Sequence, residues 1–236
     1  MSLSLPPEEE RARAVQRMFS RIAARYDLMN RLMTGGMDLA WRREVIRRAA
    51  LRPGERLLDL GAGTGDLARE ALHQQPHCRV VAADFTLAMM LAGKTRPPAP
   101  SAWVAADALR LPFPDAAFDA VVSGFLLRNV TDLPQALREQ MRVLRPGGRF
   151  IALDTTRPRP GLLSPLIGFH MHRIIPFLGG LLTGDRAAYT YLPQTSQHFL
   201  TAEELLSRLI EAGFTGAGFR RLNFGTVAIH WATRPA

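Results

Sequence analysis

The sequence predicts a doubly wound α/β domain, and three observations support this prediction. Short apolar segments typical of strands alternate with helix-like segments from residue 56 to residue 153. These strand-like segments are nearly continuous in apolar residues, as is typical of parallel strands covered on both faces. A glycine-rich turn follows the first strand-like segment and opens a helix. Such alternation implies right-handed crossovers and a ligand site at the carboxyl ends of the strands.

The elements follow in order along the chain. Apolar residues at three- and four-residue intervals predict helices over residues 8–34 and 38–50, which together form an N-terminal helical cap over residues 8–50. Gly35-Gly36 separates the two helices. Strands are then predicted over residues 56–60, 79–83, 102–105, 118–123 and 149–153, with helices over 66–73, from 88 onward and over 133–144.

The last third of the chain departs from this alternation. Residues 156–196 are rich in Leu, Ile, Phe, Pro and Gly, and we expect them to form an apolar insertion over the active site. A helix is predicted over residues 202–212, and strands over 217–224 and 226–232 form an expected terminal antiparallel pair. The alternative without a functional role is that the insertion is an ordinary pair of core helices.

Composition bounds the class of protein. The 236 residues are 47% hydrophobic, which is enough for a single domain over residues 1–236. Cys78 is the single cysteine, so no intramolecular disulfide forms and a reducing compartment is expected. No metal site is expected, because His73, His77 and Cys78 lack a second ligand pair. No run of about 18 apolar residues predicts a membrane span, and the acidic start is unlike a signal peptide, so we expect a cytoplasmic protein.

The net charge of +9 raises two classes of partner, nucleic acid and an anionic membrane surface. No run of basic residues interleaves with aromatic residues, so a nucleic-acid groove is not expected. The alternative to a charged partner is that the arginines are scattered over solvated helix faces.

The central motif is the turn Gly61-Ala62-Gly63-Thr64-Gly65-Asp66. Glycine lets a backbone turn sharply and approach a ligand closely, and the helix that follows adds partial positive charge. The spacing G-x-G-x-G differs from the G-x-G-x-x-G of dinucleotide-binding folds. Asp66 in the first helical turn is expected to repel a phosphate and to attract an ammonium group. Both features argue against a nicotinamide-dependent oxidoreductase.

Two more acids follow the next predicted strands. Asp84 ends the second strand, where a carboxylate accepts hydrogen bonds from both hydroxyls of a ribose. Asp107 follows the third strand, where it is placed to accept a hydrogen bond from the amino group of adenine. Any one of these acids alone is explained as a helix cap or surface residue. Together they favour an adenosine-containing cofactor.

The sequence resembles the C-methyltransferases of menaquinone and ubiquinone biosynthesis over nearly its whole length. The segments that carry the resemblance are 19–30, 41–43, 63–67, 107–108, 111–115, 127–130, 191–193 and 228–230. The resemblance implies a Rossmann-like, class I S-adenosylmethionine-dependent methyltransferase fold with a seven-stranded, mostly parallel sheet. Its cofactor positions carry over onto Thr64, Asp84, Asp107 and Ala108, and we expect Gly61 and Gly63 of the glycine-rich turn to bind the same cofactor.

The chain departs from this family at two positions. Leu126 stands where the family usually has glycine, so we expect a narrower pocket. Asp154 stands where the family usually has glutamate. The rest of the pattern is closer to the menaquinone branch, whose substrate is a prenylated naphthoquinol.

The resemblance also suggests catalytic residues. Methylation of a ring carbon needs the reduced quinol as a phenolate, and a phenol with a pKa of ~10 is mostly protonated at neutral pH. We expect Arg128 to stabilise the phenolate, Asn129 to orient a ring oxygen and Tyr26 to close the pocket. The alternative for Arg128 is a surface position or an ion pair, and Tyr26 and Asn129 have the alternative of packing or capping.

The resulting hypothesis is S-adenosylmethionine-dependent C-methylation of demethylmenaquinol to menaquinol. The competing hypotheses are methylation of a ubiquinone-pathway quinol, another small molecule or RNA, an oxidoreductase, and a non-catalytic scaffold. The apolar insertion suits a prenyl tail, since each buried CH₂ contributes about 0.8 kcal/mol. A lipid substrate and the positive charge together predict transient contact with the inner face of the membrane.

Overall fold

A computed structural model of the chain describes residues 8–157, 173, 195 and 199–236. The strands are β1 Arg56–Leu60, β2 Arg79–Asp84, β3 Ala102–Ala105, β4 Phe118–Gly124, β5 Leu144–Thr155, β6 Thr215–Leu222 and β7 Val227–Thr233. The α-helices are α1 Glu8–Ile22, α2 Tyr26–Thr34, α3 Met37–Ala49, α4 Asp66–Gln74, α5 Leu87–Lys94, α6 Leu133–Val143 and α10 Ala202–Glu211. Short 3-10 turns are η1 Ala23–Arg25, η2 Leu127–Asn129 and η4 Asn223–Gly225.

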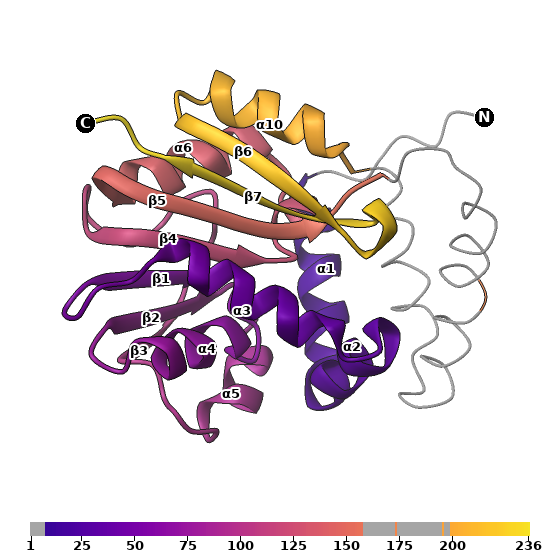
Figure 1. Ribbon diagram of the computed structural model, residues 1–236. Helices are drawn as coiled ribbons and strands as arrows, with labels where there is room; N and C mark the ends of the chain where they lie inside the picture. Colours follow the sequence, from indigo (N-terminus) through magenta and orange to yellow (C-terminus); the bar gives the residue numbers. More distant parts are fainter. Residues whose placement is uncertain (1–7, 158–172, 174–194, 196–198) are drawn as a thin grey trace, which may run out of the picture.

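These strands form one seven-stranded sheet in the order β3-β2-β1-β4-β5-β7-β6 (Figure 1). Neighbours from β3 through to β5 pair in parallel, whereas β7 pairs antiparallel with both β5 and β6. The predicted seven-stranded, mostly parallel sheet is therefore confirmed. The predicted terminal antiparallel pair is also confirmed, with its connection at η4, where Phe224 has a φ of 54°.

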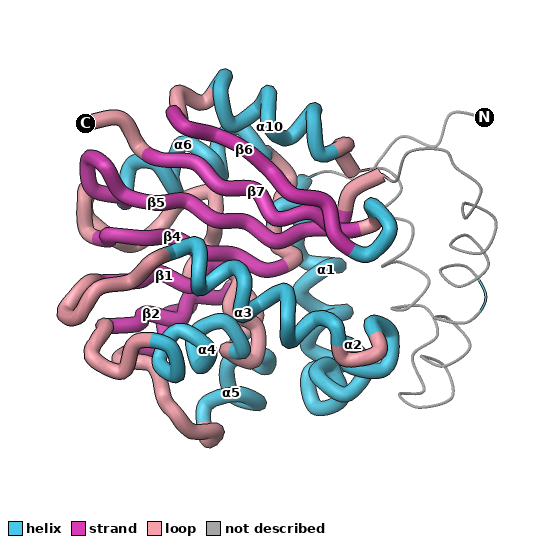
Figure 2. Tube along the Cα trace, viewed as in Figure 1, coloured by secondary structure: helices cyan, strands magenta, loops and turns pink. Residues whose placement is uncertain are grey.

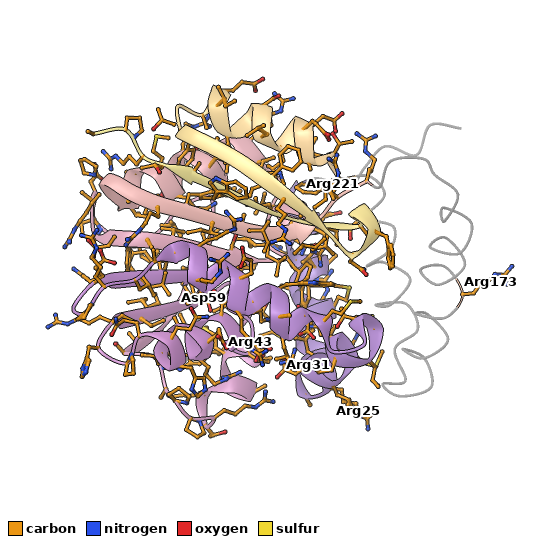
Figure 3. All side chains as sticks on the ribbon, in the orientation of Figure 1. Arg25, Arg31, Arg43, Asp59, Arg173 and Arg221 are labelled. Atoms are coloured by element: carbon orange, nitrogen blue, oxygen red, sulfur yellow. The ribbon has the colours of Figure 1, made fainter. Side chains whose placement is uncertain are left out.

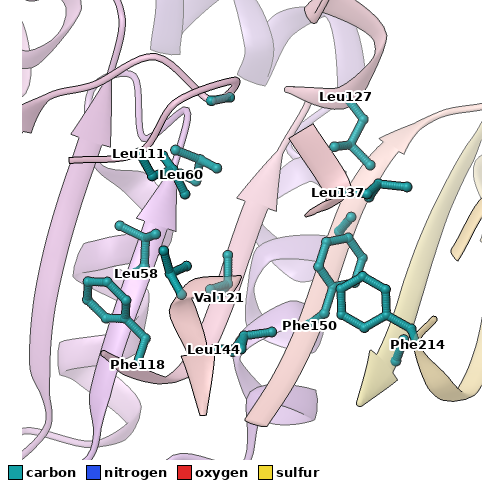
Figure 4. Close-up of a cluster of buried hydrophobic side chains, with 14 of the residues drawn as sticks. Leu58, Leu60, Leu111, Phe118, Val121, Leu127, Leu137, Leu144, Phe150 and Phe214 are labelled. Carbon is teal, nitrogen blue, oxygen red and sulfur yellow. The ribbon is translucent and has the colours of Figure 1, made fainter. Parts of the chain in front are cut away.

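Helices cover both faces of the sheet, as a doubly wound fold requires (Figure 2). On one face, α3 and α4 pack on the strands through residues such as Trp41, Ile46 and Leu67. On the other face, α6 and α10 pack through Leu137 and Leu205. Figure 4 shows this second cluster, in which Leu58, Val121 and Phe150 of three adjacent strands meet Leu137 and Phe214. Because β1 pairs in parallel with both β2 and β4, the carboxyl ends of these three strands lie together at one edge of the sheet.

The predicted helix over residues 8–34 is interrupted. It consists of α1, the 3-10 turn η1 and α2, so the chain changes direction between two helices. Gly35 and Gly36 both have left-handed φ values, of 58° and 78°, and end α2 before α3 begins at Met37. Glycine tolerates that conformation because it lacks a Cβ atom.

Strand β5 is longer than the predicted strand over 149–153. It begins at Leu144, which pairs with Phe118, and the register shifts before Ala120 pairs with Arg149. The segment Arg145–Gly148 thus lies within an irregular strand.

Most of the predicted apolar insertion over residues 156–196 lies outside the described residues, so its structure stays a prediction. The single domain over 1–236 and the cap over 8–50 likewise stay as predictions of domain organisation. No helix in the described part of the chain is long and apolar enough to cross a membrane.

Candidate active site

The glycine-rich turn after β1 is held tightly by its neighbours. Gly61, Gly63 and Gly65 have φ values of 67°, 58° and 85°. A Cβ atom on Gly61 would lie 2.9 Å from Leu126 Cδ1, and one on Gly65 would lie 2.7 Å from Trp103. The sequence therefore needs glycine here both for backbone conformation and for close packing.

Asp84 closes this turn from the end of β2. One carboxylate oxygen accepts a hydrogen bond from the backbone N–H of Gly63 at 2.7 Å, and the other accepts from the N–H of Thr86 at 2.7 Å. Burial raises the pKa of Asp84 above its usual value, against the lowering effect of these two bonds. Each oxygen keeps a further lone pair for a ligand.

A pocket containing about 890 Å³ of empty space, part of it open to solvent, lies at the carboxyl ends of the parallel strands. This is the place that the alternating pattern predicts for a ligand site. Seven of the nine predicted site residues line it: Tyr26, Gly61, Gly63, Asp84, Asp107, Ala108 and Asn129.

One wall of the pocket comes from the N-terminal helices. Val15, Gln16 and Phe19 of α1 line the pocket together with Tyr26 at the start of α2. Gln16 Nε2 donates a hydrogen bond to the backbone oxygen of Phe85 at 2.9 Å, which docks α1 on the loop after β2. The rings of Phe19 and Tyr26 meet edge to face at 5.9 Å. Helical periodicity predicted that α1 has an apolar face, but not that this face covers the pocket.

Asp107 and Ala108 lie at the third strand end, as predicted. Ala108 is buried, whereas Asp107 is exposed and accepts a hydrogen bond from the N–H of Leu109 at 2.9 Å. The Asp107 carboxylate thus keeps acceptor capacity at the pocket.

Asn129 lies in η2, beside Leu126. Its Nδ2 donates to the backbone oxygen of Phe125 at 2.9 Å. Its Oδ1 is buried and has no hydrogen-bond partner among the described residues. An unpaired buried carbonyl oxygen is costly, so this atom is a candidate acceptor for a ligand hydroxyl.

Thr64 lies in the turn but does not line the pocket in the described part of the chain. Its side chain is 2% exposed, and its hydroxyl donates a hydrogen bond to Asp27 Oδ1 at 2.7 Å. Its hydroxyl is thus directed to the N-terminal cap, and the predicted cofactor contact of this residue stays a prediction.

Arg128 does not line the pocket either. Its Nη1 donates to Asp154 Oδ1 at 2.6 Å, and the two side chains are 6% and 2% exposed. The guanidinium also lies over the ring of Phe125, 4.9 Å from its centroid. The ion pair that the sequence offered as the alternative for Arg128 is present, and the predicted stabilisation of a phenolate stays a prediction. Asp154, which lies at the end of β5, attracts the guanidinium.

Asp66 also has other partners than predicted. Its carboxylate accepts hydrogen bonds from Arg31 at 2.8 Å and from Arg69 at 2.7 Å, and Arg42 Nε lies 3.6 Å away. Burial alone raises the pKa of Asp66, but the charges of Arg42 and Arg31 outweigh it and hold this pKa below its usual value. Arg31, labelled in Figure 3, thus reaches from α2 to the first turn of α4. Asp66 is committed to these arginines rather than to a ligand ammonium group.

Known protein families provide a further comparison. Residues 7–234 match the model of the ubiE/COQ5 methyltransferase family. The chain belongs to this family. The predicted resemblance is therefore confirmed, together with the reaction class, methyl transfer, and the methyl donor, S-adenosylmethionine.

Relatives within the ubiE/COQ5 family match the chain almost from end to end. The demethylmenaquinone methyltransferase of Roseiflexus castenholzii is 44% identical over 227 residues, which cover 96% of this chain and 95% of the relative. The ubiquinone/menaquinone biosynthesis C-methyltransferase of Desulfotalea psychrophila is 41% identical over 93% of this chain and 90% of its own.

Solved structures support the fold. The [4+2]-cyclase SpnF superposes with a TM-score of 0.69 at 18% identity, covering 94% of this chain and 95% of its own. SpnF is a cyclase by name, so the shared fold alone does not specify methyl transfer. Family membership, rather than the fold, identifies this chain as a methyltransferase.

Proposed function

We propose that this chain transfers a methyl group from S-adenosylmethionine to a ring carbon of a demethylmenaquinol and so produces a menaquinol. The observation that carries the proposal is one pocket that combines the strand-end acids Asp84 and Asp107 with the unpaired carbonyl of Asn129. The name of the Roseiflexus relative, which spans nearly the whole chain, points to the same substrate.

The residues at the turn fit an adenosyl group. Asp84 has a lone pair on each oxygen left for the two ribose hydroxyls, and Asp107 has acceptor capacity for an adenine amino group. A Cβ atom on Gly63 would lie 3.3 Å from Met89 Cε, so glycine keeps this wall of the pocket open. The bound cofactor supplies an electrophilic methyl group on a sulfonium.

Residues of the chain itself would bind and orient the quinol. Asn129 Oδ1 accepts a hydrogen bond from a quinol hydroxyl and so fixes the ring relative to the methyl group. The aromatic pair Phe19 and Tyr26 excludes water from this side of the pocket. Asp84 and Asp107 would hold the cofactor, which would supply its methyl group to the ring carbon as the bond between that methyl group and sulfur breaks. S-adenosylhomocysteine would be the leaving group, and the proton lost from the ring carbon would pass to solvent.

Arg128 has a positioning role in this proposal. Its ion pair with Asp154, together with the N–H of Arg128 that donates to Asp154 at 3.3 Å, ties η2 to the end of β5. Asn129 is the next residue in η2, so this pair sets where the carbonyl of Asn129 lies.

Methyl transfer from labelled S-adenosylmethionine tests the proposal. The acceptors are chemically reduced demethylmenaquinol and, in parallel, a demethylated precursor of ubiquinol. Label in the naphthoquinol alone is the expected result. Label in the ubiquinol precursor alone would assign the enzyme to the other branch. Absence of label from both, in a protein that binds the cofactor, would refute the quinone substrate.

We further propose that the chain meets the membrane surface through an apolar patch on α2 and the start of α3. The patch consists of the exposed side chains of Leu28, Leu32, Met37 and Leu39, of which Leu28 is 54% exposed. Exposed Arg43 lies on α3 and suits anionic headgroups. Tyr26 of α2 lines the pocket, so the patch lies on the helix that also contacts the substrate site.

Co-sedimentation with phosphatidylglycerol vesicles at low salt tests this surface. We expect binding that Leu28→Ser/Leu32→Ser weakens and that Ile210→Ser leaves unchanged. Ile210 is a matched control, because it is 59% exposed but lies on α10. Equal losses in both variants, or no binding by the unaltered protein, would refute the surface.

A further inference from the structure

A hydrogen bond from Thr64 Oγ1 to Asp27 Oδ1 at 2.7 Å joins the N-terminal cap to the cofactor turn, in addition to the ion pair of Arg31 with Asp66. Asp27 follows Tyr26 in sequence, and Thr64 follows Gly63, so each partner adjoins a residue that lines the pocket. The bond therefore joins two walls of the pocket directly. Thr64 is 2% exposed, so water competes little for its hydroxyl.

Other groups fix Thr64 and Asp27 in place. Arg96, just after α5, forms an ion pair with the second oxygen of Asp27. Arg69 donates to the carbonyl oxygen of Thr64 at 2.8 Å. A Cβ atom on Gly93 would lie 2.0 Å from that same carbonyl oxygen, so the backbone of α5 rests directly against the turn. The cap therefore contacts the hydroxyl of Thr64, while α4 and α5 contact its carbonyl oxygen.

A charged cluster holds the far end of the cap. Asp38 is fully buried and pairs with Arg31 and with Arg42, and Arg31 also pairs with Asp66 at 2.8 Å. This cluster joins α2 to α3 and α4 through residues that do not line the pocket. The Asp27–Thr64 hydrogen bond, in contrast, lies directly beside Tyr26, which does line it.

We infer that Asp27 and Thr64 are positioning residues that latch the N-terminal cap onto the cofactor turn. A ligand enclosed between the cap and the turn stabilises the closed state, and the latch stabilises the same state. Cap closure and cofactor binding therefore reinforce each other, and loss of the latch lowers the apparent affinity by lowering the closed fraction. The inference rests on the proposed function only for the identity of the cofactor.

Variants at the two partners test the latch. Thr64→Val keeps the shape and removes the hydroxyl, Thr64→Ser keeps the hydroxyl, and Asp27→Asn removes the charge. Calorimetry measures the Kd of S-adenosylhomocysteine, and hydrogen exchange measures the protection of residues 8–34 in the ligand-free protein. We expect Thr64→Val to weaken binding about tenfold, the effect of losing one hydrogen bond to a charged group. Asp27→Asn should weaken binding less, because its amide oxygen still accepts from the Thr64 hydroxyl. Both should speed exchange in the cap, and Thr64→Ser should restore both readouts.

The double variant distinguishes a latch from direct contact with the cofactor. If Thr64 acts through Asp27, Thr64→Val/Asp27→Asn binds no more weakly than the weaker single variant. Additive losses, or unchanged cap exchange in Thr64→Val, would overturn the inference. Thr34→Val is the matched control, because Thr34 donates to Asp38 at 3.0 Å within the cap and should leave binding unchanged. Neither readout needs a quinol, so failure of the methylation assay would leave this test intact.

Discussion

Replacement of Arg128 by Met tests how the buried ion pair supports the site. The Arg128 and Asp154 side chains are 6% and 2% exposed and meet at 2.6 Å. Arg128→Met leaves the buried Asp154 carboxylate without a charged partner. Its remaining donors are the N–H of Thr155 at 2.7 Å, the N–H of residue 128 at 3.3 Å and the hydroxyl of Thr155 at 3.5 Å. Removal of one partner from such a pair costs about 3–5 kcal/mol of folding free energy. That is a large share of the ~5–15 kcal/mol that stabilises a typical domain.

Urea unfolding followed by tryptophan fluorescence measures this cost, and Arg128→Met/Asp154→Leu is the matched variant. It removes both charges, so we expect it to regain most of the lost stability. A loss below about 1 kcal/mol in Arg128→Met would refute the reasoning, since that is the range of a solvent-exposed pair.

Turnover of the stable double variant then separates the two roles of Arg128. Recovered methyl transfer supports a positioning role. A folded double variant that binds the cofactor but does not turn over would return Arg128 to direct stabilisation of the phenolate.

Three further predictions follow from burial and packing. Gly93→Ala should reduce both thermal stability and cofactor affinity, because its Cβ would lie 2.0 Å from the Thr64 carbonyl oxygen and force α5 and the turn apart. Gly35→Ala is the control: its Cβ meets no atom within 4 Å, so it should reduce thermal stability alone. Thermal unfolding measures the stability of both variants, and calorimetry measures their cofactor affinity. Burial raises the pKa of Asp59 from 3.8 to about 7 in the folded protein, so the folded state holds a proton that the unfolded state has lost, and stability should fall as the pH rises from 4 to 7. Asp59→Asn should remove up to about 4 kcal/mol of that decline in unfolding titrations, and an unaltered pH profile would contradict the assignment. Leu126→Ala should widen the pocket and lower the KM for quinols with bulkier rings, whereas an unchanged KM series would show that Leu126 does not limit the acceptor.

Much of the fold was predictable because its signals are local. Each parallel strand is a short apolar run, and the strand ends carry acids that the sequence shows directly, such as Asp84 and Asp107. The glycine turn was predictable for the same reason. Seven of the nine predicted site residues line one pocket, which agrees with the rule for sheets of this kind.

The side-chain partners that the sequence did not predict lie far apart along the chain. Arg128 pairs with a residue 26 positions away, Thr64 with one 37 positions away, and Asp66 with Arg31, 35 positions away. A local pattern shows that these side chains are polar, but only the packing of cap on sheet decides which charges meet. The alternative drawn from the net charge was that the arginines are solvated on helix faces. Arg42 and Arg128 instead form ion pairs with the buried acids Asp38 and Asp154.

The place of β7 in the sheet has a consequence for how the chain is made. In the described part of the sheet, β6 pairs only with β7, and β7 lies between β6 and β5 although it is synthesised after both of them. Until Val227–Thr233 leaves the ribosome, β6 has no place to dock and the edge of β5 is unpaired. An unpaired edge invites pairing with other chains. Nascent chains stalled before Val227 should therefore aggregate or recruit chaperones, and the emergence of β7 should end that exposure.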